Sequence, residues 1–210
     1  MSIRTIFLID GFNLYHSIVD IARYCNGLNV RWLNISSLFT SYLHLISKDA
    51  AIESIYYFSA LAYHLKDPDV IFRHETYIKC LRKTGVEDSL GRFKPKTIRC
   101  SQGWNITRYE EKETDVAIPS KILEVLFTDK CDSVVLITGD TDQTPAAKTA
   151  KLLFPDKHIV FAFPYRRKNE ELARLAPGSF KIHSRSYVQH QFPDPFILSD
   201  GTQIPKPSRW

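Results

Sequence analysis

The chain has 210 residues, of which 44% are hydrophobic and 24% are charged. These fractions are close to the averages of globular domains, so they exclude a largely disordered chain and allow a sizeable core. The net charge of +5 is too small to identify a polyanion-binding protein by itself. No run of about 18 apolar residues occurs, and the amino-terminal apolar stretch is too short for a signal peptide. We therefore expect a cytoplasmic protein with no membrane association.

Four cysteines are widely separated along the chain, at Cys25, Cys80, Cys100 and Cys131. Neither a C-x2-C pair nor a histidine at zinc-finger spacing accompanies them, so a zinc site is not expected. Reduced and mostly buried thiols are the better interpretation.

In the first half of the chain, the spacing of apolar residues predicts a buried strand at 3–9, helices at 14–25 and 35–46, a second strand at 52–58 and a third helix at 67–83. The following stretch, residues 86–109, is interrupted by Gly91, Pro95 and Gly103. We expect either a hairpin or a long functional loop there.

In the second half, helical and strand patterns alternate again, with a helix at 120–127, a strand at 133–138, a helix capped by Thr144 and ending at 153, a strand at 158–163, a short helix at 169–175 and an extended piece at 180–182. This order predicts an α/β fold: an open, mostly parallel sheet with helices on both faces.

Residues 1–188 form the predicted domain, and residues 189–210 differ from it in composition. Four of the eleven prolines fall in this last stretch. We expect an extension there, either a packed arm or a small hairpin, and a candidate surface for a second copy of the chain or a protein partner.

Two of the strongest strand signals end at a carboxylate, since Asp10 follows the first strand and Asp140 follows the strand at 133–138. In open α/β sheets, ligands bind outside the carboxyl ends of parallel strands, so we expect both acids at one edge. Asp142 lies two residues further on and is expected to face the same cavity. Clustered carboxylates raise one another's pKa unless a cation lies between them, and their oxygen atoms suit Mg2+ or Mn2+.

An ordinary structural role is also open for each acid. An Asp after a strand commonly caps the next helix, and Asp-Gly is a common turn. Asp115 precedes or begins a predicted helix, where the helix dipole favours a carboxylate whether or not it binds a metal.

Taken in order, three motifs resemble those of the NYN domain, a branch of the PIN-like ribonucleases. The first is a strand followed by I-D-x-x-N, at residues 9–13. The second is K-x-x-D-V entering a helix, at residues 112–116, and the third is T-G-D-x-D with a proline three residues later, at residues 138–145. The resemblance spans residues 3–183.

The resemblance implies a Rossmann-like, three-layer PIN fold and a metal-dependent nuclease that acts on RNA. Asp10, Asp115 and Asp140 would be the metal-binding acids, with Mg2+ or Mn2+ as the cofactor. Asp142 would be a fourth catalytic acid, further from the metal.

The resemblance also gives roles to two polar neighbours of these acids. Asn13 would orient Asp10 or a phosphate oxygen, and the hydroxyl of Thr138 would form a hydrogen bond within the cluster. One departure concerns Pro119, four residues after Asp115. A proline beyond the first turn disrupts a helix, so we expect this helix either to start near Ile118 or to be kinked.

Basic residues gather in two places. Between residues 73 and 108 nine basic side chains face three acidic ones, a local charge of +6, with Phe93, Trp104 and Tyr109 interleaved. Such a stretch is typical of a groove that binds phosphates and stacks bases, although a solvated face with core aromatics fits the same pattern. A second cluster follows the strand at 158–163 and is expected to bind a phosphate group: Arg166, Arg167 and Lys168.

The leading hypothesis is a Mg2+- or Mn2+-dependent endoribonuclease acting on single-stranded or structured RNA. The alternative is a non-catalytic RNA-binding or regulatory module on the same fold. A small-molecule phosphohydrolase is a third candidate. Enzymes of the haloacid-dehalogenase type require D-x-D after the first strand, whereas here Asp10 is followed by Gly11 and Phe12.

Overall fold

The computed structural model describes residues 2–99 and 104–210. Cys25, Cys80 and Cys131 are free thiols, and the last two are buried, whereas Cys100 lies outside the described residues. Within the described ranges, no helix is both long enough and apolar enough to cross a bilayer.

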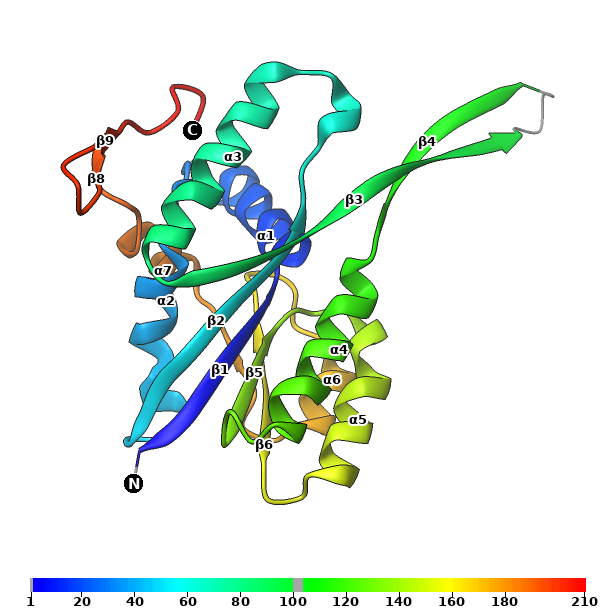
Figure 1. Cartoon of the computed structure of the whole chain (residues 1–210), viewed down its shortest axis with the longest axis vertical. Coiled ribbons are helices and arrows are strands. Elements are labelled where there is room, and N and C mark those ends of the chain that lie inside the picture. The colour runs from blue at the N-terminus through cyan, green and yellow to red at the C-terminus, as the bar shows by residue number, and fades with distance from the viewer. Residues whose placement is uncertain (1, 100–103) are drawn as a thin grey trace.

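A seven-stranded sheet forms the centre of the molecule, in the order β4-β3-β2-β1-β5-β6-β7 (Figure 1). Its strands are β1 (Ile3–Asp10), β2 (Ala50–Ala60), β3 (Val86–Arg99), β4 (Asn105–Lys112), β5 (Ser133–Ile137), β6 (His158–Phe163) and β7 (Phe180–Lys181). All neighbours are parallel except β3 and β4. The predicted open, mostly parallel α/β sheet is confirmed.

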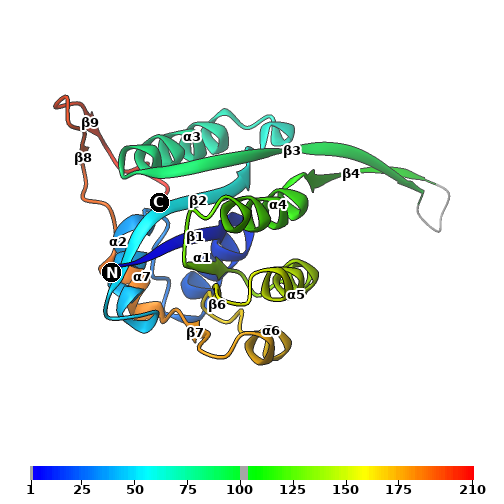
Figure 2. The same ribbon diagram turned by 60° about the horizontal axis from the view of Figure 1, so that its bottom comes forward.

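Helices cover both faces of this sheet (Figure 2). They are α1 (Gly11–Tyr24), α2 (Ile35–Tyr42), α3 (Pro68–Lys83), α4 (Thr114–Phe127), α5 (Thr144–Leu153), α6 (Glu170–Leu175) and α7 (Ser184–Gln189). Two buried clusters divide along the alternation of the strands: Phe7 and Ile9 pack with α1, α2 and α3, and Ile6 and Leu8 pack with α4, α5 and α6. Successive strand residues point to opposite faces, which explains this division.

The stretch 86–109 folds as a hairpin that continues into a long arm. Beyond the pair Ala60–Gly91, β3 no longer contacts β2, and its residues 92–99 pair only with β4. Both views show this two-stranded arm extending well away from the sheet (Figures 1 and 2).

Residues 189–210 contain a two-stranded hairpin, β8 (Phe196–Ile197) and β9 (Gln203–Ile204), and the chain then returns to the body at Trp210. Trp32 holds this segment, because its indole Nε1 donates to the carbonyl of Pro193 over 3.1 Å. The rings of Phe192 and Trp210 lie 5.5 and 6.1 Å from that of Trp32. The extension is therefore both a packed arm and a small hairpin.

The structure differs from the sequence prediction most clearly at the starts of α4 and α5 and at one helix that was not predicted. Helix α4 begins at Thr114, not near Ile118, and it runs through Pro119. The carboxylate of Glu111 accepts hydrogen bonds from the backbone N–H and hydroxyl of Thr114, which fixes the helix start early. Thr144 is the first residue of α5 rather than its cap, because the short 3-10 turn η3 (Thr141–Gln143) precedes it. Helix α7 was not anticipated.

An ion-pair cluster joins the amino ends of β1 and β5. The Arg4 guanidinium donates to both carboxylate oxygens of Asp132, over 3.1 and 2.8 Å, and the Arg4 backbone N–H donates over 2.9 Å. Lys157 contacts both Asp129 and Asp132. These contacts, led by the Arg4 hydrogen bonds, hold the pKa of Asp132 well below its usual range.

We predict that Asp132→Asn lowers the free energy of unfolding at pH 7 by about 1 kcal/mol, a value limited by solvent screening of this partly exposed pair. A carboxyl whose pKa is depressed by folding contributes stability above its unfolded pKa, near 4, and loses it as the pH falls. Denaturant unfolding at several pH values measures the difference, which should shrink below about pH 4. Asp156→Asn, at an exposed site, is the control. Equal stability of Asp132→Asn and wild type at pH 7 would contradict the assignment.

Candidate functional site

The candidate site lies where the order of the sheet reverses. Without the antiparallel β4, the parallel strands lie in the order β3-β2-β1-β5-β6-β7. The chain adds β2 and β3 on one side of β1 and then β5, β6 and β7 on the other side, so the order reverses between β1 and β5. Such a switch point is where open α/β sheets bind ligands, outside the carboxyl ends of the strands. Ile9 pairs with Ile137 at that end, so Asp10 and Thr138 leave the sheet side by side.

Asp10 is buried and uses both carboxylate oxygens. Its Oδ1 accepts the backbone N–H of Asn13 over 3.0 Å, which caps α1. Its Oδ2 accepts from Asn13 Nδ2 over 2.6 Å and from the Thr138 hydroxyl over 2.9 Å. The side chain of Asn13 also accepts the N–H of Gly139 over 3.2 Å. Asp10, Asn13 and Thr138 therefore link β1, α1 and the end of β5.

Asp140 and Asp142 stand on the turn that follows β5. The Asp140 N–H donates to the Thr138 hydroxyl over 3.1 Å, and the Asp140 carboxylate accepts the Asp142 N–H over 3.0 Å. Gly139 permits this turn, because a Cβ there would lie 2.0 Å from the carbonyl oxygen of Arg167. A side chain at residue 139 would thus push the two acids away from β6 and its loop.

Asp115 lies in the first turn of α4, a helix that packs against the turn η3, and the charges of Asp140 and Asp142 act on it. It is exposed, whereas Asp10 is 7% exposed. Gly91 allows this approach, since a Cβ there would meet the Lys112 carbonyl at 2.6 Å and the Glu111 carboxylate at 2.7 Å. The early helix start reported above therefore keeps Asp115 beside the turn that carries Asp140.

The charges of these acids act on one another. Burial raises the pKa of Asp10 above its ordinary value, its hydrogen bonds to Asn13 and Thr138 oppose the increase, and the charge of Asp140 adds to it. Partial burial also raises the pKa of Asp115, and the charges of Asp140 and Asp142 raise it further. The charge of Asp140 thus acts on both Asp10 and Asp115, and that of Asp142 acts on Asp115, so the four sequence-predicted acids lie near one another at one edge of the sheet.

The donor set suits a hard divalent cation, because carboxylate oxygens that repel one another are relieved by a positive charge. Among residues 2–99 and 104–210, however, no three His, Cys, Asp or Glu side chains are arranged to hold one ion. Mg2+ commonly binds through one or two carboxylates and keeps several waters, so the arrangement fits that mode rather than a three-ligand cage. The set Asp10, Asp115 and Asp140 as joint ligands stays a prediction.

The cluster Arg166, Arg167 and Lys168 lies beside the turn at Gly139, but its charges have partners. The guanidinium of Arg166 stacks 4.0 Å from the ring centre of Tyr24. Arg167 donates to Asp20 over 2.7 Å, and Lys168 donates to the Glu170 carboxylate over 2.6 Å. These pairs reduce the positive charge that the cluster could offer to a phosphate, which the sequence order alone did not reveal.

The arm separates charge from aromatic surface. Cross-strand pairs share a face, so the register puts five basic residues and one acidic residue on one face: Arg92, Lys94, Lys96, Arg108, Lys112 and Glu110. The opposite face carries Phe93 and Tyr109, whose rings lie 4.2 and 4.7 Å from that of His64. The positive charge of Lys112 lowers the pKa of Asp115, so the basic face ends next to the acids.

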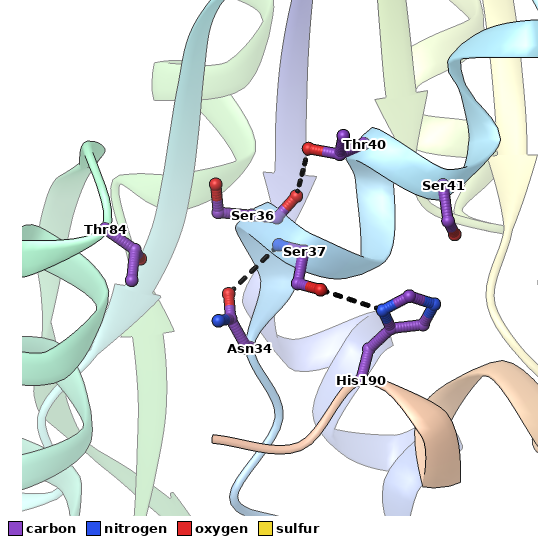
Figure 3. Close-up of a pocket in the computed structure, with 7 residues that line it drawn as sticks. All are labelled: Asn34, Ser36, Ser37, Thr40, Ser41, Thr84 and His190. Atoms are coloured by element: carbon purple, nitrogen blue, oxygen red, sulfur yellow. Dashed lines mark hydrogen bonds between the residues drawn. The ribbon is translucent and has the colours of Figure 1, made fainter. Parts of the chain in front are cut away.

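A separate open hollow of about 460 Å3 lies at the start of α2, lined by hydroxyl groups (Figure 3). The hydroxyl of Ser37 contacts Nδ1 of His190 at 2.9 Å, and the Ser37 N–H donates to Asn34 over 3.0 Å. The backbone N–H of Asn34 also donates to the His190 carbonyl. No acidic side chain lines this hollow in the described ranges, so the serine–histidine pair lacks the third group of a hydrolase triad. Its contacts tie α7 to α2.

A larger cavity lies on the α1 and α3 side of the sheet, and no sequence pattern indicates the residues around it. Arg31, Tyr57, His64 and Trp210 line it, and Arg73 was counted only as part of a basic stretch. These residues are spread over the whole chain, and no local spacing relates them. Only the packing of α3 and the carboxyl-terminal segment against β2 brings them together.

No family model and no curated protein matches the chain. Among solved structures, it is similar to a protein of unknown function from Vibrio parahaemolyticus, with 17% identity, a TM-score of 0.58 and coverage of 87% of this chain and 94% of that one. It also matches MurG from Acinetobacter baumannii, with 10% identity, a TM-score of 0.39 and coverage of 90% of this chain and 43% of that one. The first likeness supports the fold alone.

The mutual repulsion of the acids leads to a prediction about metal binding. At tenfold excess over its Kd, Mn2+ should raise the melting temperature of the wild-type protein by about 3–6 °C. Asp140→Asn should abolish most of this gain. The melting temperature of the metal-free variant should equal or exceed that of the wild type, because the charge of Asp140 no longer repels Asp10 and Asp115. Differential scanning calorimetry measures both effects.

Asp156→Asn serves as the matched control, because it removes one carboxylate at an exposed position of the turn before β6. The gain should also decrease from pH 7 to pH 5, since the raised pKa values of Asp10 and Asp115 favour protons over metal there. An equal Mn2+ gain in wild type and Asp140→Asn would remove this turn from the metal site.

Proposed function

We propose that the protein is a metal-dependent ribonuclease that hydrolyses phosphodiester bonds within RNA, with the NYN-domain motifs described above as its catalytic residues. The observation that carries this proposal is the joint position of Asp10, Asp115, Asp140 and Asp142 at the switch point of the sheet. The basic face of the arm ends beside the same acids, which is what a nuclease needs to hold a polyanion at its acidic centre.

The chain's own residues would divide the work between positioning and charge. Asn13 and the Thr138 hydroxyl fix the Asp10 carboxylate by hydrogen bonds, so it keeps its place despite the repulsion of its neighbours. Asp140 and Asp115 supply the negative charge that draws a cation to the edge of the sheet. Asp142, exposed one turn further on, is suited to accept a proton from a water near the scissile phosphate.

A bound Mg2+ or Mn2+ would lower the pKa of a water molecule and polarise the phosphoryl oxygens of the substrate. Two of the acids would hold the metal ion. One of them would be Asp140, because its charge acts on both Asp10 and Asp115. Substrate phosphate oxygens commonly complete such a shell.

The second candidate function is a non-catalytic RNA-binding module on the same fold. It is favoured by the arrangement of the acids, no three of which are set to hold one ion in the described part of the chain. In that case, the arm would bind RNA and the acids would serve only as the helix cap and turn residues that they also are. The two candidates differ in a single measurable property, turnover.

We predict that the protein cleaves a fluorophore-labelled RNA in the presence of Mn2+ or Mg2+, and that EDTA stops the reaction. Asp140→Asn should reduce the rate by about 100-fold, because changing even the outer-shell partners of a metal site commonly costs about 10–100-fold in activity. Substrates with a blocked 5′ end, a blocked 3′ end or a closed circle separate internal cleavage from trimming.

Asp156→Asn, purified in parallel, should cleave at the wild-type rate. Equal cleavage by wild type and Asp140→Asn, or cleavage that survives EDTA, would point to a contaminant and remove the enzymatic proposal. RNA retention without turnover in any metal would favour the binding module instead.

The basic face of the arm gives a separate prediction about affinity. Lys94 and Arg108 have no ion-pair partner within the described residues, so both charges are available to phosphates. Lys94→Gln/Arg108→Gln should weaken binding to single-stranded RNA and make the slope of log K against log salt shallower by about 1.4.

Fluorescence anisotropy at several salt concentrations measures this slope. Lys48→Gln/Arg185→Gln removes the same charge from exposed positions away from the arm and should leave the slope unchanged. If both double variants lower the affinity equally, the effect is one of net charge and the arm is not the binding surface.

A further inference from the structure

A cavity of about 600 Å3 lies between α1, α3, the end of β2 and the base of the arm. This volume is within the range of sites that bind small organic ligands. Gly11, the residue after Asp10, forms part of its wall, so the cavity adjoins the acid cluster. A Cβ on Gly11 would lie 2.5 Å from the Phe58 carbonyl, which shows how closely α1 and β2 approach there.

Aromatic rings form two walls of the cavity. At the base of the arm, the ring of Phe93 lies 6.0 Å from that of Phe12 and 4.2 Å from that of His64. On the α3 side, the ring of Tyr77 lies 6.4 Å from that of Tyr57 and 5.6 Å from that of Trp210. A cavity with flat π surfaces on two sides is suited to a planar, aromatic ligand, because such rings stack.

The charged groups of the cavity are cationic. Three arginines line it, Arg31, Arg73 and Arg209, and no Asp or Glu does so among the described residues. Arg31 and Arg73 are half-buried and have no ion pair within the described ranges, whereas Arg209 lies 4.0 Å from Asp69. Arginine is the side chain that binds phosphate groups through paired N–H donors. The ligand should therefore carry negative charge as well as a ring.

One polar atom of the lining lacks a partner. The Nδ1 atom of His64 is buried and forms no hydrogen bond within the described residues. Buried polar atoms normally have partners, so an orphaned ring nitrogen in a cavity wall indicates a position for a ligand or water group. His74, also in the wall, is half-buried, and burial lowers its pKa, so it faces the cavity as a neutral imidazole near pH 7.

We propose that this cavity is a nucleotide-binding subsite, which takes the base of a ribonucleotide between the aromatic walls and its phosphate on Arg31 and Arg73. The inference rests on the proposed ribonuclease function for its biological meaning, because a base held next to Gly11 would belong to the strand whose backbone passes Asp10. The binding itself needs no catalysis and can be measured without it.

The experiment titrates AMP, GMP, CMP and UMP into the full-length protein in EDTA, so that binding is measured with no metal ion at the acids. Isothermal titration calorimetry gives Kd, and tryptophan fluorescence, to which Trp210 in the cavity wall contributes, gives an independent signal. We expect at least one mononucleotide to bind with a submillimolar Kd. The matching nucleoside and inorganic phosphate, each alone, should bind at least about tenfold more weakly, since each lacks half of the recognised groups.

Arg73→Gln should raise Kd at least about tenfold. Arg185→Gln, an exposed arginine on α7 outside the cavity, should leave Kd unchanged. Arg31→Gln, in the segment between α1 and α2 rather than on α3, provides the same test if Arg73→Gln fails to fold, as judged by thermal unfolding.

Failure of all four nucleotides to bind, phosphate binding as tight as nucleotide binding, or equal Kd values in Arg73→Gln and Arg185→Gln would each overturn the proposal. Failure of the ribonuclease proposal looks different: nucleotides bind in EDTA and Arg73→Gln weakens them, but RNA is not cleaved with metal. Conversely, cleavage with no nucleotide binding would remove the subsite and leave the nuclease.

Discussion

The repulsion between carboxylates at the β1–β5 switch point is the interaction on which the candidate site depends. Asp10 keeps its position because three hydrogen bonds, from Asn13 and Thr138, hold a charged group that burial and Asp140 both disfavour. The same bonds cap α1 and join it to the end of β5. Capping and metal binding are therefore compatible for this residue, since the cap fixes the carboxylate at the place where a cation would relieve the repulsion.

The other acids are held by close backbone approaches rather than by side-chain bonds. Gly139 lets the turn with Asp140 and Asp142 lie against the Arg167 carbonyl, and Gly91 lets the start of α4 lie against β3. Both contacts require the absence of a Cβ, so the geometry of the acids depends on two residues that carry no chemistry themselves. The basic arm and the aromatic cavity with its arginines both adjoin this centre, the arm through Lys112 and the cavity through Gly11.

Much of the fold follows from the sequence because its signals are local. The apolar strands at 3–9 and 133–138, and the Asp67 cap before Pro68, are visible without any tertiary information. A helix start near Ile118, one of the two outcomes expected from Pro119, is wrong because the hydrogen bonds of Thr114 to Glu111 start α4 earlier, beside Asp115 as the K-x-x-D-V motif indicated. The partners of Arg166, Arg167 and Lys168, and the walls of the cavity, depend on contacts between distant segments. No periodicity or motif encodes such contacts.

The two-stranded arm formed by β3 and β4 bears on self-association of the protein. Beyond Gly91 the ribbon has two open edges, and unpaired edges invite a second strand to add to them. Pro95 removes one backbone donor from such an edge, and Lys94 and Lys96 would meet the lysines of an identical ribbon. The same positive charges thus keep copies of the ribbon apart by repulsion. Neutralising them would remove this repulsion and favour aggregation through the open edges.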